Sequence, residues 1–149
     1  MTEEHDRPVP PEDVTVEQAL PDDRLDILRI LDAAMLETDA ATVDDRMAAG
    51  DALVARSTRT GGVVGALVAV RPDSGRLHVD AVAVRRARRG RGIGSALVAA
   101  AVDRAESDPA VGVVSAAFDA DLIGFYAALG FALDAASAGE ARRVGRRPA

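Results

Sequence analysis

The sequence predicts an α/β fold, with one mixed β-sheet that carries helices on both faces. In the first half of the chain, strand-forming runs are separated only by short turns rich in Gly, Pro, Asp and Ser, which is typical of antiparallel hairpins. In the second half, an amphipathic helix stands between two apolar runs, which is typical of a parallel βαβ unit. The 149 residues fit one domain. We assign residues 13–149 to it and expect residues 1–12, rich in charge and proline, to be a disordered lead-in.

The predicted elements begin with a strand and two short helices. Apolar and polar residues alternate over 14–19, the pattern of a half-buried strand. Pro21 and the two aspartates after it open a helix. Its apolar residues recur at helical spacing, at Leu25, Leu28, Leu31 and Met35. A second helix is predicted over 42–50, with Thr42 as its N-cap and Gly50 at its end.

The remaining elements are recognised by apolar runs bounded by turn residues, and by apolar side chains that recur every three or four positions. They are strands 51–57, 62–70 and 75–84, helix 93–106, strand 111–118, helix 121–130 and strand 131–135. The arginine-rich tail after residue 135 either completes a last strand or stays loose.

Composition excludes several kinds of site. The chain has no cysteine, which excludes disulfides, thiolate metal sites and cysteine acyl-enzymes. His5 and His78 are the two histidines, and we therefore expect no metal site. The net charge of -6 argues against a general nucleic-acid-binding protein. We expect a cytoplasmic protein without membrane contact, because no signal-peptide pattern and no run of about 18 apolar residues is present.

An arginine- and glycine-rich segment, RRARRGRGIG over 85–94, lies between a predicted strand and a predicted helix. Glycines allow the backbone to approach a ligand, and the first N–H groups of a helix attract anions. Arginine adds charge-assisted hydrogen bonds to phosphate. The segment therefore predicts a phosphate-binding loop, and the simpler alternative is a solvated basic turn. A P-loop is excluded because the chain has no lysine, and the spacing does not give G-x-G-x-x-G.

Two motifs resemble the signatures of the GCN5-related N-acetyltransferase (GNAT) family. The first, Arg/Gln-x-x-Gly-x-Gly/Ala, stands here as Arg89 to Gly94. The second, an Asn followed seven residues later by Tyr, stands as Asp119 and Tyr126 within DADLIGFYAALGF. The resemblance covers roughly residues 13–135. It implies the acyl-CoA N-acyltransferase (GNAT) fold, an α+β mixed sheet, and acetyl-CoA as cosubstrate.

The resemblance also implies which residues bind acetyl-CoA. Backbone N–H groups of the loop would hold the diphosphate, and the end of the preceding strand would pair with pantetheine. The residues so assigned are Val82, Ala83, Val84, Arg89, Gly90, Arg91, Gly92, Ile93, Gly94, Ser95 and Asp119. Asp119 departs from the family, because an ionised carboxylate cannot donate the hydrogen bond that an Asn amide donates.

The family tyrosine matches Tyr126, which would protonate the departing CoA thiolate. Tyr126 is the one tyrosine of the chain, and the alternative role of its ring is core packing.

The base that takes the proton of the amine is less well defined. Asp80 stands where some small-amine acetyltransferases of the family have a glutamate, and would act directly or through water. Alternatives are a salt bridge from Asp80 to a loop arginine, or His78 as the base. A period of two places His78, Asp80, Val82 and Val84 on one face of the strand. Some peptide-acetylating members use a glutamate at the position of Val114, which weakens that assignment here.

Without cysteine, the expected mechanism is direct attack of a primary amine on the thioester in a ternary complex. Ser115 as an acyl carrier is disfavoured, because no histidine lies near it in sequence. Acidic residues in and around the first two helices favour a small cationic amine as acceptor: Asp22, Asp23, Asp26, Asp32, Glu37, Asp39, Asp44 and Asp45.

Other functions remain open at this point. The chain could be a non-catalytic acyl-CoA-binding or sensing domain, a peptide or protein N-terminal acetyltransferase, or an acidic interaction protein whose basic loop binds another polyanion. The resemblance also leaves a homodimer open.

Overall fold

The computed structural model describes residues 8–34, 36, 39–134 and 142–149. Within these residues seven strands form one sheet in the order β1-β2-β3-β4-β5-β7-β6. The strands are β1 (Val14–Gln18), β2 (Ala52–Ser57), β3 (Val63–Val70), β4 (Arg76–Val84), β5 (Val113–Asp119), β6 (Ala132–Leu133) and β7 (Arg142–Pro148). The helices are α1 (Arg24–Ala33), α2 (Ala40–Ala49), α3 (Ile93–Glu106) and α4 (Ile123–Ala128), with short 3₁₀ turns at Pro21–Asp23, Arg86–Arg88 and Ala120–Leu122.

The order of elements confirms the sequence prediction. The arginine-rich tail completes a last strand, because it forms β7, which lies between β5 and β6. The predicted N-cap of the second helix was wrong. Asp39 caps α2, since its carboxylate accepts a hydrogen bond from the Thr42 N–H at 2.7 Å, and Thr42 lies inside the helix. Met35, expected in the first helix, lies outside the described residues.

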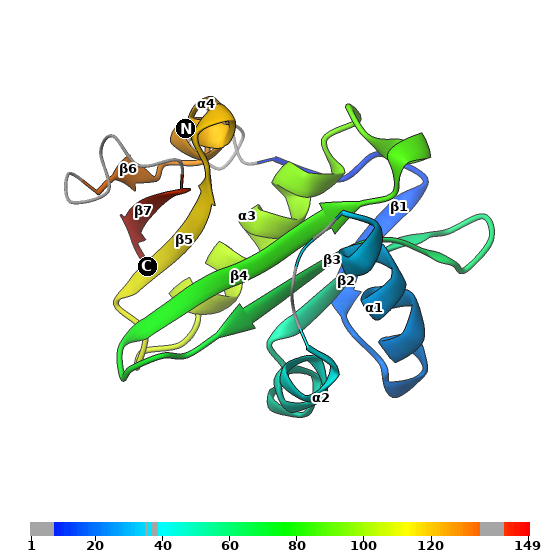
Figure 1. Ribbon diagram of the computed structural model, residues 1–149, viewed down its shortest axis with the longest axis horizontal. Helices are drawn as coiled ribbons and strands as arrows, with labels where there is room; N and C mark the ends of the chain where they lie inside the picture. Colours follow the sequence, from blue (N-terminus) through cyan, green and yellow to red (C-terminus); the bar gives the residue numbers. More distant parts are fainter. Residues whose placement is uncertain (1–7, 35, 37–38, 135–141) are drawn as a thin grey trace.

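The sheet is mixed, as predicted. Strands β1 to β4 are antiparallel neighbours, β4 and β5 are parallel, and β7 is antiparallel to both β5 and β6. Figure 1 shows α1 and α2 on one face of the sheet and α3 crossing the other. Each face has its own apolar core. In the part of the chain described here, no helix is long and apolar enough to cross a membrane.

A β-bulge at Asp80 divides β4 into two segments. Val79 pairs with Ala69 of β3 and Ala81 pairs with Val68, so Asp80 is the extra residue. Before the bulge, Leu77 and Val79 pack in the core beneath α3; after it, Ala81 and Ala83 pack in the core beneath α1 and α2. The prediction that His78, Asp80, Val82 and Val84 share one face is therefore wrong, because a bulge reverses the alternation of a strand.

The same strand separates from β5 just beyond the bulge. The parallel ladder between β4 and β5 ends at the pair Val79–Ala116, although β4 continues to Val84 and β5 to Asp119. Strand β5 keeps its other neighbour, because its ladder with β7 extends to Asp119. The two central strands are thus paired at one end and open at the other.

Gly65 of β3 allows α3 to pack closely on the sheet. A Cβ at this position would lie 3.2 Å from a methyl group of Ile93 and 3.2 Å from one of Leu97, tighter than ordinary contacts. Both side chains belong to the first turns of α3, so Gly65 sets how closely the start of this helix approaches β3.

We expect Gly65→Ala to lower the free energy of unfolding by about 1–3 kcal/mol, because the added methyl group overpacks this contact. Urea denaturation measures the change. Gly124→Ala in α4 is the control, since no atom lies within 4 Å of its Cβ position, and it should unfold at the same urea concentration or slightly above. Equal stability of Gly65→Ala and the wild type would contradict the close approach of α3.

Candidate functional site

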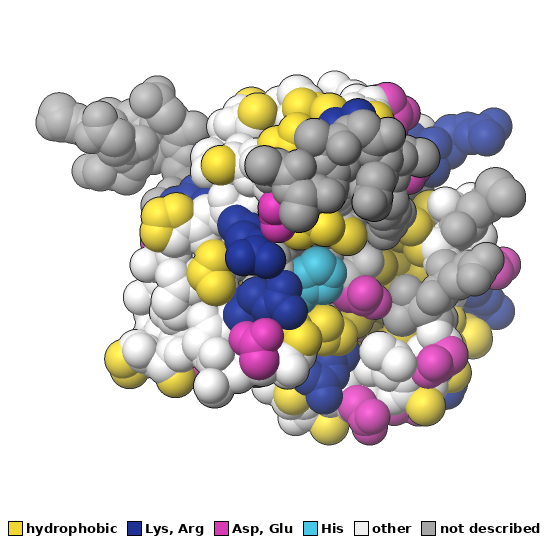
Figure 2. Space-filling model, turned by 60° about the vertical axis from the view of Figure 1, so that its left-hand side comes forward, with side chains coloured by type: hydrophobic (Ala, Val, Ile, Leu, Met, Phe, Trp, Pro, Cys, Tyr) yellow, Lys and Arg dark blue, Asp and Glu magenta, His cyan; other side chains and the backbone are white. Residues whose placement is uncertain are grey.

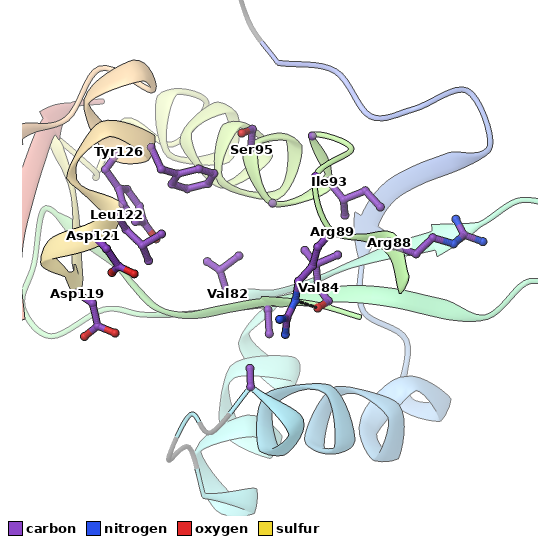
Figure 3. A pocket seen from close by; sticks show the side chains of 16 residues that line it. Val82, Val84, Arg88, Arg89, Ile93, Ser95, Asp119, Asp121, Leu122 and Tyr126 are labelled. Atoms are coloured by element: carbon purple, nitrogen blue, oxygen red, sulfur yellow. Dashed lines mark hydrogen bonds between the residues drawn. The ribbon is translucent and has the colours of Figure 1, made fainter. Parts of the chain in front are cut away.

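A cavity of about 730 Å³ opens where β4 leaves β5. Its walls come from the end of β4, the glycine loop, the start of α3 and the segment from Asp119 into α4 (Figure 3). The lining residues are Ala34, Val82, Ala83, Val84, Arg88, Arg89, Gly90, Gly92, Ile93, Gly94, Ser95, Asp119, Asp121, Leu122, Phe125 and Tyr126.

The glycine loop has the conformation of an anion-binding loop. Gly90 and Gly92 have φ angles of +79° and +84°, a region that other residues rarely adopt. No atom lies within 4 Å of a Cβ built on either glycine, so the backbone beside the cavity is open. Gly92 is the N-cap of α3, whose first turn, Ile93 to Ser95, lines the cavity. The free N–H groups and the dipole of a helix N-terminus attract anions.

The loop arginines are not simply solvated. The Nε of Arg89 donates to the carbonyl of Val84 at 3.1 Å, and the Nε of Arg85 donates to the carbonyl of Val63 at 2.7 Å. Arg88 forms an ion pair with Asp13 at 3.5 Å. These contacts tie the loop to β3, β4 and the start of β1, which is unlike a loose basic turn. Arg91 is exposed and does not line the cavity.

Tyr126 stands at the inner end of the cavity and is 5% exposed. Its ring stacks on Phe118 with centroids 4.2 Å apart and meets Phe125 and Phe131 edge-on at 5.0 and 5.4 Å. The ring is therefore part of the core on the α3 side of the sheet and also a wall of the cavity. The two roles that the sequence left as alternatives are compatible for one side chain.

A second, narrower cavity of about 70 Å³ adjoins the first. Both are lined by Val82, Asp119, Leu122 and Tyr126. The narrow cavity also reaches Asp80 in the bulge, Ala117 of β5, and Leu36, which packs against the core beneath α1 and α2. Because Tyr126 belongs to the other core, side chains from both cores line the narrow cavity, which lies between the separated ends of β4 and β5.

Charge changes sign along the large cavity. Figure 3 shows Arg88 and Arg89 at one end, and Asp119 and Asp121 at the end where Tyr126 lies. Asp80 adds a carboxylate in the narrow cavity. An anion is thus favoured at the loop and a cation near Tyr126.

Asp80 and His78 have separate environments. Within the described ranges, no loop arginine forms an ion pair with Asp80; Arg88 pairs with Asp13 instead. His78 lies before the bulge, where its Nδ1 and the Ser115 hydroxyl oxygen share a hydrogen bond of 2.7 Å.

The sequence analysis disfavoured Ser115 as an acyl carrier because no histidine lies near it in sequence. The fold does bring a histidine beside it, because the β4–β5 register pairs Ser115 directly with His78. Ser115 is nevertheless fully buried and lines neither cavity.

Several of the acidic residues around the first two helices have partners within the protein. Arg56 donates to Asp23 at 2.7 Å, Arg24 binds Asp44, and Asp39 caps α2. Burial raises the pKa of Asp23, but hydrogen bonds from Arg56 and the Leu20 N–H, together with the charge of Arg56, lower it more, so it ends below its usual value. A small cationic acceptor stays a prediction. Glu37 lies outside the described residues.

Sequence reasoning missed several residues of the site. Leu122 and Phe125, three positions apart, line the large cavity together with Tyr126. Their helical spacing before Tyr126 was the signal that could have identified them. Arg88 lies within the arginine- and glycine-rich segment that the sequence analysis predicted to bind phosphate, whereas Leu36 and Asp121 carried no sequence signal. Among the described residues, no group of three His, Cys, Asp or Glu side chains could hold a metal ion.

Three solved structures resemble this fold. Ard1 from Thermoplasma volcanium has a TM-score of 0.76 at 22% identity, over 91% of this chain and 97% of its own. Naa50 from Arabidopsis thaliana, in complex with the bisubstrate analogue CoA-Ac-MVNAL, has a TM-score of 0.71 at 20% identity, over 91% and 98%. An agmatine N-acetyltransferase has a TM-score of 0.74 at 16% identity, over 93% and 100%. The comparison with curated proteins gives no match.

The sequence itself also matches a family description. The model of the acetyltransferase (GNAT) family matches residues 20–131, a range that includes the glycine loop, Asp80 and Tyr126. The fold, the site between β4 and β5 and this match agree: the chain belongs to the GNAT acetyltransferase family.

Proposed function

We propose that the protein is an N-acetyltransferase that moves the acetyl group of acetyl-CoA to a primary amine by direct attack in a ternary complex. The observation that carries the proposal is the pair of joined cavities. One begins at an anion-binding loop, the other lies between the separated ends of β4 and β5, and Tyr126 lines both. Two substrates that occupy the two cavities would therefore meet at Tyr126. We also propose that residues 13–149 form one catalytic domain and that it acts in the cytoplasm.

The large cavity fits acetyl-CoA. Val82, Ala83 and Val84 lie where β4 has no strand partner on the β5 side, so the backbone groups that point to that side would pair with pantetheine as an added strand would. At the Val84 carbonyl, pantetheine would share or replace the hydrogen bond from Arg89 Nε. Gly90, Gly92, Ile93, Gly94 and Ser95 would hold the diphosphate through backbone N–H groups, with Arg88 and Arg89 adding positive charge. Arg91 would contribute only through its backbone or from the surface, because its side chain does not line the cavity.

Two residues that line the narrow cavity would act as the base and the acid, Asp80 and Tyr126. An alkylamine arrives as an ammonium ion, since its pKa is near 10. Asp80, directly or through water, would take one proton, and the amine nitrogen would then bond to the thioester carbon. As the carbon–sulfur bond breaks, the Tyr126 hydroxyl would give its proton to the CoA thiolate. The nitrogen would lose its second proton to water at the same stage, and a proton from water would restore the tyrosine hydroxyl. The products are an N-acetyl amine and CoA with its thiol protonated.

A non-catalytic acyl-CoA-binding domain is the second candidate. It is favoured by Asp119, which stands in place of the family's Asn and lies at the junction of both cavities. Peptide acetylation is less favoured, because Val114 is fully buried in the core beneath α3 and no carboxylate stands at that position.

A matched pair of substitutions at Gly94 tests the cofactor site. A Cβ here would lie 3.7 Å from Phe125 and 3.8 Å from Val84, ordinary contact distances, so Gly94→Ala should fold and bind acetyl-CoA. Gly94→Glu should weaken binding at least about tenfold, because it places a bulky anion at the helix N-terminus that would receive the diphosphate. Isothermal titration calorimetry measures both dissociation constants. Tight acetyl-CoA binding by Gly94→Glu would refute this location.

Substitution of Tyr126 by Phe separates the enzyme from the binding domain. The phenyl ring preserves the stack on Phe118, so the protein should fold and the Kd for acetyl-CoA should hardly change. We expect kcat to fall about 100-fold or more, the usual contribution of a general acid. Release of CoA thiol is the assay, with Phe125→Leu as a control for ring packing. An undiminished kcat in Tyr126→Phe would assign the tyrosine to the core alone.

A further inference from the structure

The face of the sheet opposite α3 carries a cluster of polar side chains that the proposed chemistry does not use. It consists of Arg76 and His78 on β4, Ser115 on β5 and Arg146 on β7, and is called here the far-face cluster. The register aligns three of these residues in one row, since Ser115 pairs with His78 on one side and Arg146 on the other. Residues paired across neighbouring strands point to the same face of a sheet. Figure 2 shows a histidine with arginine side chains against it on one face of the molecule.

The cluster is an ordered polar arrangement. Ser115 is fully buried, and its hydroxyl oxygen accepts a hydrogen bond from Arg76 at 3.3 Å and shares one of 2.7 Å with His78. Arg76 is also paired with Asp73 at 3.3 Å, and Arg146 with Asp134 at 3.6 Å. Asp73 and Arg146 are more than half exposed, and exposed ion pairs contribute about 0–1 kcal/mol, so both arginines can bind another anion at small cost.

The cluster lies beside the opening between β4 and β5. The row of His78 and Ser115 belongs to the part of the β4–β5 ladder that is still paired, next to its end at Val79–Ala116. Two residues further along the strands, Asp80 and Ala117 line the narrow cavity. Asp80 is the bulge residue two positions after His78, at the point where the β4–β5 ladder ends. The far-face cluster is therefore adjacent in sequence and in the sheet to the carboxylate that lines the narrow cavity.

We propose that the far-face cluster binds a carboxylate of the acceptor, so that the acceptor is an amino acid whose amine and carboxylate are several bonds apart. This inference rests on the proposed acetyl transfer. The ammonium group meets Asp80 and the acidic end of the cavities, while the carboxylate meets Arg146, Arg76 and His78. Guanidinium groups suit this role, because their fork of N–H donors matches a carboxylate. Such an acceptor is a zwitterion, unlike the small cationic amine that the sequence favours.

Paired acceptors that differ only in the carboxylate test the inference. 5-Aminopentanoate spans about 6 Å from nitrogen to carboxylate carbon when extended, and pentylamine is the same chain without the carboxylate. The variants are Arg146→Gln, which removes an exposed charge of the cluster, and Arg29→Gln, which removes an exposed charge on α1 as the control. The readout is the ratio of kcat/KM for the two acceptors, measured by release of CoA thiol.

We expect the wild type and Arg29→Gln to favour 5-aminopentanoate about tenfold or more, the effect of one charge-assisted hydrogen bond. Arg146→Gln should lose most of this preference through a higher KM for 5-aminopentanoate. Equal use of both acceptors, preference for pentylamine, or an Arg146→Gln ratio equal to that of the wild type overturns the inference and leaves acetyl transfer standing. If the protein acetylates none of the four amines (5-aminopentanoate, pentylamine, glycine and 1,4-diaminobutane), the proposed function and the inference are both overturned.

Discussion

The site depends on one feature of backbone hydrogen bonding, the end of the β4–β5 ladder at Val79 and Ala116. The bulge at Asp80 comes at the same point and reverses which side chains of β4 face α3. Bulges disrupt a ladder locally and re-aim the side chains that follow. If β4 and β5 were paired along their whole length, side chains from the two cores could not line one cavity. The opening therefore results from the point at which β4 and β5 stop pairing, and the residues that give the site its chemistry are arranged around it.

The elements around the opening hold it at fixed dimensions. Gly65 permits α3 to approach β3, which places the glycine loop at the end of β4. Arg85 and Arg89 donate hydrogen bonds to strand carbonyls, so the loop is tied to the sheet that it follows. On the other side, the stack of Tyr126 on Phe118 fixes the tyrosine against β5, where its ring can reach both cavities. Most of these contacts involve strands rather than exposed loops. Such support suits a site that must hold two substrates in a fixed relative orientation.

Local sequence patterns predicted most of the fold and part of the site. Alternation, helical spacing and turn residues gave the order of the elements, and the spacing of Gly90, Gly92 and Gly94 predicted the loop. The N-cap of α2 was a local error, and the other errors arose where the outcome depends on residues far apart in sequence. The bulge at Asp80 depends on the pairing of β4 with β3, and the hydrogen bond between His78 and Ser115 joins residues 37 positions apart. The engagement of Asp23 by Arg56 likewise depends on a partner 33 residues away.

A crystal structure of the protein with CoA tests the central claim most directly, because the claim concerns where one ligand lies relative to one gap in the sheet. The account predicts the diphosphate at the N-terminus of α3, pantetheine paired with the backbone of Val82–Val84, and the sulfur beside Tyr126 at the narrow cavity. CoA bound away from the β4–β5 opening would contradict the account, as would a continuous β4–β5 ladder beyond Val79 and Ala116.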